Sequence, residues 1–123
     1  MQDYRVYRVV DTDSGMEIAD NVRLAKSFRE RLLGLMGMKK LESGSGLWLN
    51  PCNGIHTFGM RFPIDVVVLD RGNAVMALVT GLKPNRVLLP IRAGHSTLEL
   101  PAGSIKGIRL PATLAFEPFA AKS

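Results

Sequence analysis

The sequence predicts a mainly β fold, a small antiparallel barrel-like or sandwich domain with one short helix near residues 27–37. Short runs rich in β-branched residues recur along the chain, and clusters of Gly, Pro, Asn and Asp separate them. Only one segment places apolar residues at helical spacing. The 123 residues, 46% of them hydrophobic and 22% charged, suffice for one ordinary core, so we expect a single domain over residues 1–123.

The first predicted elements are two strands joined by a tight turn. Tyr4–Val10 alternates aromatic or β-branched residues with arginine, which is typical of a strand, although neither face is purely apolar. Asp11–Gly15 favours a turn, because Asp and Ser side chains bond their own backbone and Gly adopts positive φ. Met16–Val22 is therefore expected to be the returning strand.

A capping box predicts where the helix begins. Ser27 is placed to accept a hydrogen bond from the amide of Glu30, whose side chain reaches back to the amide of Ser27. Gly34 indicates either the close approach of another backbone or an early helix end, and Gly37 is the expected stop. The apolar residues at helical spacing are Phe28, Leu32, Leu35 and Met36.

The middle of the chain contains the strongest strand pattern. Ile64–Leu69 is a short, nearly continuous β-branched run, which predicts a strand covered on both faces. Before it, Leu47–Leu49 predicts a short strand and Ile55–Met60 a strand-like segment, with a turn at residues 50–54 between them. After it, residues 70–73 predict a hairpin turn whose glycine is available for positive φ.

The C-terminal part predicts further short strands. Ala74–Val79 is the expected partner of the preceding strand, and Val87–Ile91 belongs at an edge or in a loop because it contains a proline. Thr97–Leu100 predicts a strand with its leucines inward and Glu99 outward. Ala112–Phe116 is the last expected strand.

Cysteine content and hydropathy indicate the compartment. Cys52 is the only cysteine, so the chain has no internal disulfide, which fits a reducing environment. The first residues lack a basic patch followed by an apolar run, and no apolar run approaches the length of a membrane span. We therefore expect a cytoplasmic protein that does not associate with a membrane.

The formal net charge of +5 is unevenly distributed. Residues 1–20 contain two basic and five acidic residues, a charge of −3, so the remainder carries +8. This asymmetry would favour an acidic partner, but the basic residues are scattered singly, as on an ordinary surface.

Several motifs occur together in a specific order. They are Arg31–Met36, Leu47–Leu49, His56–Met60, Phe62–Asp70 and Leu98–Gly103. Together they resemble the small bacterial and archaeal family catalogued as domain of unknown function 192, over about residues 25–107. The resemblance implies a compact β-barrel-like domain with one or two short helices, and it implies no particular activity. The glycine-aspartate pair found in many relatives is replaced here by Leu110-Pro111-Ala112, so no role is transferred from that aspartate.

The densest mixture of polar and core-forming residues lies at residues 56–70. We predict a polar pocket floored by Asp65, with His56, Thr57 and Arg61 on its rim. Glu99 contributes if its strand lies alongside; otherwise it is an ordinary acid on the solvent face. The alternative for Asp65 is structural, because a buried acid needs partners: amides of the preceding turn at residues 61–63, or an arginine.

From this pocket we expect a non-enzymatic binding or accessory module for a small polar or anionic ligand or a partner protein. Arg61 would contact an anion, and His56 would orient the ligand. The alternative is a hydrolase or transferase in which His56 is the general base and Asp65 orients it.

A further alternative is a barrel that binds RNA or single-stranded DNA. Tyr4, Tyr7 and Phe62, with nearby arginines, are residue types on which bases stack. The aromatic-basic consensus motifs of such proteins are absent, so we do not expect nucleic acid as the partner.

Cys52, His56 and His95 are the residues that suggest a nucleophile or a metal site. A nucleophile and its base need hydrogen-bond contact, yet four residues of one strand span roughly 13 Å, so Cys52 and His56 meet only if the turn at residues 53–54 folds back. A thiolate with two imidazoles is an incomplete set of ligands for zinc or copper. We therefore expect no metal and no cofactor.

Overall fold

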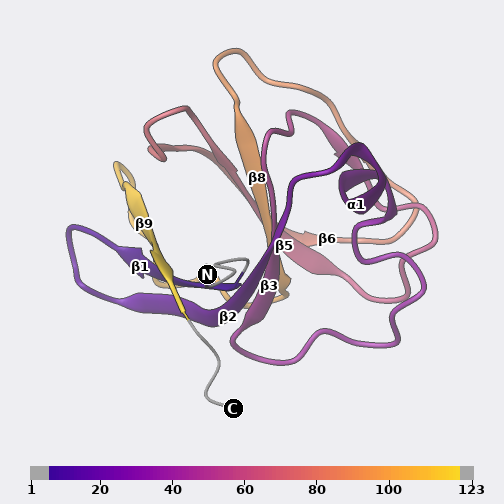
Figure 1. The fold of residues 1–123 in the computed structure, drawn as a ribbon, viewed down its shortest axis with the longest axis horizontal. Coiled ribbons are helices and arrows are strands. Elements are labelled where there is room, and N and C mark those ends of the chain that lie inside the picture. Colours follow the sequence, from indigo (N-terminus) through magenta and orange to yellow (C-terminus); the bar gives the residue numbers. More distant parts are fainter. Residues whose placement is uncertain (1–5, 120–123) are drawn as a thin grey trace.

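The computed structural model describes residues 6–119, which form a curved seven-stranded sheet, a two-stranded sheet and one helix (Figure 1). The order of strands in the large sheet is β6-β5-β8-β3-β2-β1-β9, and the small sheet pairs β4 with β7. The strands are β1 (Val6–Asp11), β2 (Glu17–Ala25), β3 (Ser45–Leu49), β4 (Ile55–His56), β5 (Ile64–Leu69), β6 (Val75–Leu82), β7 (Val87–Leu88), β8 (Ser96–Pro101) and β9 (Leu114–Pro118), and the helix is α1 (Phe28–Leu33).

The predicted fold class is confirmed, since the molecule is mainly β with a barrel-like curvature and one short helix. The large sheet is a mixed half-barrel rather than a purely antiparallel one, because β2 pairs in parallel with β3. After β2, the crossover through α1 and the following loop brings the chain back to the edge of the sheet at which β2 begins, so β2 and β3 run in the same direction. No helix among residues 6–119 is long and apolar enough to cross a membrane.

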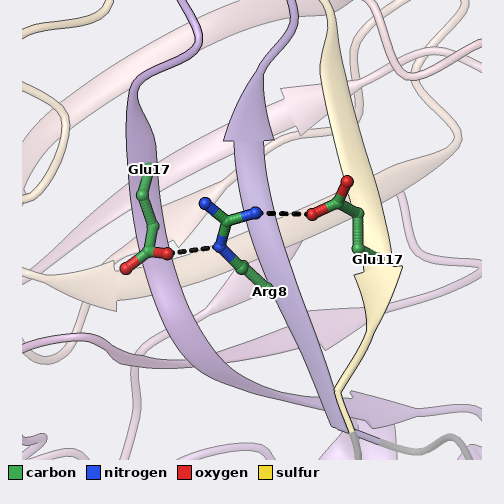
Figure 2. Close-up of polar contacts among 3 residues, drawn as sticks. All are labelled: Arg8, Glu17 and Glu117. Carbon is green, nitrogen blue, oxygen red and sulfur yellow. Dashed lines mark hydrogen bonds and ion pairs between the residues drawn. The ribbon is translucent and has the colours of Figure 1, made fainter.

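The first hairpin shows why arginine alternates with apolar residues there. Arg8 of β1 donates to Glu17 of β2 on one side and to Glu117 of β9 on the other, the latter at 2.7 Å (Figure 2). The three side chains are solvent-exposed, so these ion pairs add little stability and instead favour the register of three adjacent strands. Tyr4, predicted to begin this strand, lies outside the described residues.

The helix begins as predicted and ends earlier than its apolar spacing indicates. Both hydrogen bonds of the capping box are present: the Glu30 amide donates to Ser27 Oγ at 3.0 Å, and the Ser27 amide donates to Glu30 Oε1 at 3.2 Å. The helix stops at Leu33 because Gly34 adopts φ +48°, so the predicted stop at Gly37 is wrong. The Phe28 and Leu32 side chains lie outside the described part of the chain.

A separate hydrophobic core packs against each face of the central strands β3, β5 and β8. Because successive side chains of a strand point to opposite faces, β3, β5 and β8 contribute to both cores. One face, which we call the Trp48 face, includes Val67 and Leu98 and packs against residues of β1, β2 and β9. The other face, the Glu99 face, includes Leu47, Leu49, Val66 and Val68, and it packs against Leu35, Met60 and the small sheet. Figure 1 shows α1 and the β1–β9 end of the sheet on opposite sides of these strands.

The prediction that Ile64–Leu69 is covered on both faces is confirmed, since all six residues are buried. The strand-like segment at residues 55–60 contributes only the two residues of β4, and the proline-containing segment after residue 86 only the two residues of β7. In the hairpin between β5 and β6, Asn73 rather than Gly72 has the positive φ, +66°. Asparagine tolerates this conformation at little cost.

Candidate functional site

A pocket of about 270 Å³ opens on the Glu99 face, between the C-terminal end of α1 and the segment that precedes and includes β4. Most of its lining is apolar. The lining residues are Arg31, Leu33, Gly34, Leu35, Met36, Leu49, Pro51, Cys52, Asn53, Gly54, Ile55, His56, Met60 and Glu99.

Burial separates the base of this pocket from its mouth. Glu99 and Leu49, which belong to the sheet, are 3% and 2% exposed. Leu33 and Met36, which follow each other closely at the end of α1, are 45% and 43% exposed. The pocket is therefore a largely apolar hollow whose buried base includes one carboxyl group, supplied by β8.

The segment at residues 51–56 forms the outer wall of the pocket, and contacts of Asn53 and Gly54 hold it in place. The Asn53 side chain donates to the Ile91 carbonyl at 2.7 Å and accepts from the Ile91 amide at 2.9 Å. Gly54 has φ +97°, and a Cβ there would lie 2.9 Å from Pro90, so this position requires glycine. These contacts attach the wall to the chain before β8 and keep the hollow open beside the sheet.

Glu99 is the most unusual residue of the site. Its Oε1 atom is buried and has no hydrogen-bond partner among the described residues. Burial raises the pKa of its carboxyl to about 7, because the apolar surroundings disfavour the charged form. The prediction that Glu99 points outward to solvent is wrong, since α1 and the 50–60 segment cover the face that alternation alone marks as the outer one.

Besides Glu99 and Asn53, three polar side chains line the pocket, namely Arg31, Cys52 and His56, and each already forms a hydrogen bond with the backbone. Arg31 donates from Nη1 to the Lys26 carbonyl. The Cys52 thiol donates to the Gly54 carbonyl at 3.4 Å, and burial raises the pKa of the thiol. At neutral pH Cys52 is therefore a protonated thiol, which is a poor nucleophile.

His56 bonds to its own loop. Its Nδ1 accepts from the Phe58 amide at 3.2 Å, and the two rings stack with their centroids 5.3 Å apart. A neutral imidazole that accepts at Nδ1 carries its proton on Nε2. In this arrangement the free ring nitrogen is a hydrogen-bond donor and has no lone pair to act as a base.

Asp65 does not floor this pocket. Because it neighbours Val66 on β5, its side chain points to the Trp48 face, opposite Glu99. It is 1% exposed, and its two oxygens accept from the amides of Gly81 at 2.9 Å, Gly103 at 2.9 Å and Ile105 at 3.2 Å. The structural alternative therefore describes Asp65, although the amides come from β6 and the turn after β8 rather than from residues 61–63.

Thr57 and Arg61 also lie outside the pocket lining. Thr57 is fully buried; its hydroxyl donates to the Lys83 carbonyl at 2.7 Å and accepts from the Arg86 amide at 2.8 Å. It thus holds the turn before β7. Arg61 is exposed. Of the five predicted site residues, the structure brings together only His56 and Glu99.

The described residues contain no group of three or more His, Cys, Asp or Glu side chains placed to hold a metal. The contribution of Arg31, Gly34, Met36 and Met60 to the pocket was not predicted. A signal was present, because four of the family-like motifs contribute residues to the pocket: residues 31–36, 47–49, 56–60 and 98–103.

These features define a class: a small half-barrel β domain with a short helix and a pocket whose base is a buried acid. The chain belongs to the family of domain of unknown function 192, described as Uncharacterized ACR, whose model matches residues 9–114. It is similar to the UPF0127 protein PF1050 of Pyrococcus furiosus, with 34% identity over 103 residues, covering 81% of this chain and 88% of that protein.

Two solved structures have the same fold. One is a protein of unknown function from Novosphingobium aromaticivorans, with a TM-score of 0.78 and 19% identity, covering 88% of this chain and 83% of that one. The other is a protein from Sinorhizobium meliloti provisionally described as a transcription regulator, with a TM-score of 0.79 and 22% identity, covering 94% and 97%. At these identities the likeness establishes the fold and carries no function to this chain.

Proposed function

We propose that this protein is a non-enzymatic binding module that holds a small, partly apolar ligand in the Glu99 pocket. One observation carries the proposal: a buried carboxyl oxygen at the base of an open hollow lacks a hydrogen-bond partner among the described residues. An unpaired buried acid is costly, and proteins rarely retain one without a reason. A ligand that reaches Glu99 supplies the missing partner and covers the apolar walls.

The composition of the walls suits this role. Small-molecule sites are largely apolar hollows with a few polar groups that orient the ligand. Here Leu35, Leu49 and Met60 provide the apolar surface, while Glu99 is the orienting group. The anionic ligand expected from the sequence is disfavoured, because Arg61 lies outside the lining and the base of the pocket is an acid.

The hydrolase or transferase alternative is less well supported by the same geometry. Asp65 lies on the opposite face from His56 and bonds only backbone amides, so it does not orient the imidazole. Nδ1 of His56 is engaged by the Phe58 amide. A pair in which one group activates the other therefore has no geometric basis here.

Nucleic-acid binding has little support as well. Tyr7 packs edge-on against Trp48 at 5.3 Å and against Phe116 at 6.5 Å, so it belongs to an aromatic cluster of the Trp48 face. Phe62 packs against the core of the Glu99 face. Neither ring forms an exposed stacking platform, and Tyr4 lies outside the described residues. A cytoplasmic location and the identity of any partner protein stay predictions.

The test is a fragment screen by two-dimensional amide NMR on the wild type and on Leu33→Trp, which places a large ring at the pocket mouth. Met76→Trp is the matched control, because Met76 is a similarly exposed apolar residue on β6 outside the lining. We expect fragments to shift amides of the 31–36 and 51–56 segments. Their affinity should fall at least tenfold in Leu33→Trp and stay unchanged in Met76→Trp. If no fragment shifts these amides, or if both variants weaken binding equally, the pocket is not a binding site.

A further inference from the structure

We infer that the ligand of the Glu99 pocket carries an ammonium or similar cationic nitrogen on a short hydrocarbon body, and that this nitrogen pairs with the Glu99 carboxylate. The inference rests on the proposed function and adds the chemical class of the ligand. Three features of the pocket support it: the unpaired acid, the lack of an internal cation paired with it, and the apolar walls.

The buried carboxyl of Glu99 needs a hydrogen-bond donor. Glu99 Oε1 is an acceptor when ionised, and the described residues offer it no donor. Its neighbours across the sheet are Leu47 of β3 and Val66 of β5, both apolar. Gly34 also lies close to this oxygen, because a Cβ built there would be 3.8 Å from Oε1, but glycine has no side chain that could donate. A donor that satisfies this oxygen therefore comes from outside the described residues, and a ligand bound in the pocket can supply it.

Neutralising the Glu99 carboxylate from within the described part of the chain requires a basic side chain beside it. The titratable residues that face the pocket are Arg31 from α1, and Cys52 and His56 from the outer wall. No Lys, Arg or His of the described residues forms an ion pair with Glu99. Arg31 donates to the Lys26 carbonyl at the other end of its helix. No basic side chain of the described residues therefore neutralises the Glu99 carboxylate, and a cationic group of a bound ligand can pair with it.

The walls of the pocket favour a ligand that is otherwise apolar. The remaining lining is mostly hydrocarbon and thioether surface, from residues including Leu33, Leu49, Met36 and Met60. A hydrocarbon chain gains about 25 cal/mol for each Å² of apolar surface removed from water. A volume of about 270 Å³ holds a short alkyl chain with its nitrogen at the base.

The competing arrangement has Glu99 protonated and donating to a carbonyl or carboxylate. The two arrangements have opposite pH dependence. Burial raises the pKa of Glu99 to about 7, so its ionised fraction increases about tenfold between pH 6 and pH 8. A cation binds the ionised form and gains affinity with rising pH, whereas an acceptor ligand binds the protonated form and loses it.

The experiment uses three probes of equal chain length, n-hexylammonium, 1-hexanol and hexanoate, titrated into the full chain and followed by amide NMR at pH 6 and pH 8. Hexylammonium stays protonated across this range, as a lysine side chain does. We expect its affinity to rise about tenfold from pH 6 to pH 8. It should also exceed that of hexanoate at least tenfold at pH 8.

Glu99→Gln keeps the size of the side chain and removes the charge, so hexylammonium should bind at least tenfold more weakly and without pH dependence. Glu42→Gln is the control, because Glu42 is an exposed acid that pairs with Lys40 outside the pocket. Tighter binding of hexanoate at pH 6 that survives in Glu99→Gln overturns the inference while leaving the proposed function standing. Failure of hexylammonium to bind the pocket also overturns it, and the fragment screen then decides the proposed function separately.

Discussion

Replacing Asp65 by asparagine should destabilise the fold strongly, because both carboxylate oxygens of Asp65 act as acceptors. Oδ1 accepts from the Gly81 amide, and Oδ2 accepts from the amides of Gly103 and Ile105. Asparagine has the same shape but only one oxygen. In its better orientation the oxygen keeps the two bonds of Oδ2, and the NH₂ group then faces the Gly81 N–H, donor against donor.

The magnitude follows from the groups left unpaired. Two buried donors, the Gly81 N–H and the new NH₂ group, then have no acceptor, each at a cost of about 1–3 kcal/mol, so the free energy of unfolding should fall by about 2–6 kcal/mol. For a domain of this size, a loss of 1 kcal/mol lowers Tm by about 4 °C. We therefore expect Asp65→Asn to melt roughly 8–24 °C below the wild type.

The assay is urea and thermal unfolding of Asp65→Asn beside a matched control, Asp70→Asn. In Asp70 a single oxygen, Oδ1, accepts from the amides of Gly72 and Ala74, both at 2.9 Å. The oxygen of asparagine can replace it, and the NH₂ group takes the other position, so we expect a loss below about 1 kcal/mol. If Asp65→Asn loses no more stability than Asp70→Asn, the three-amide network is not what holds Asp65 in the fold.

Three further predictions concern single positions. Burial raises the pKa of Glu99 to about 7 from 4.5, so between these pH values the folded chain keeps a proton that the unfolded chain has lost. The free energy of unfolding of the wild type, measured in urea, should therefore fall by about 3 kcal/mol from pH 4.5 to pH 8, and Glu99→Gln should lack this fall. Thr57→Val leaves the Arg86 amide and the Lys83 carbonyl without the hydroxyl of Thr57 and should lower the free energy of unfolding in urea by about 1–3 kcal/mol. Thr57→Ser keeps the hydroxyl and should lose much less stability than Thr57→Val; equal losses would contradict the role of the hydroxyl. Gly46→Ala places a Cβ 2.7 Å from the Leu100 side chain of β8, so thermal melting should show a loss of stability of about 1–3 kcal/mol. In the control Gly72→Ala the new Cβ meets no atom nearer than 3.6 Å and stability should not change, whereas an unchanged Tm in Gly46→Ala would refute the close packing of β3 on β8.

Local patterns predicted the elements that depend on neighbours in the chain. The spacing of Ser27 and Glu30 predicted the helix start, because a capping box is closed within four residues. The β-branched run at residues 64–69 predicted a strand buried on both faces. The order of the motifs indicated the family, and the match over residues 9–114 confirms it.

The site was predicted only in part, and Glu99 and Asp65 show why. A strand of alternating leucine and glutamate indicates one covered and one open face, yet β8 lies in the middle of a sheet with a core on each side. An acid beside His56 and Arg61 in the sequence suggests a shared pocket, yet the pleat turns Asp65 to the opposite face from Glu99.

By itself, therefore, the sequence determined the mainly β class, the beginning of the helix, the doubly buried strand and the family. Each of these depends on residue types and spacings along a few neighbouring positions. Tertiary structure alone decided the parallel pairing of β2 with β3, the covering of the Glu99 face, and the amides that bind Asp65, which lie 16, 38 and 40 residues away. The physical reason is that desolvation and hydrogen-bond satisfaction depend on which distant segments pack together. The same carboxyl group is an exposed surface charge or an unpaired buried acid according to whether α1 covers it.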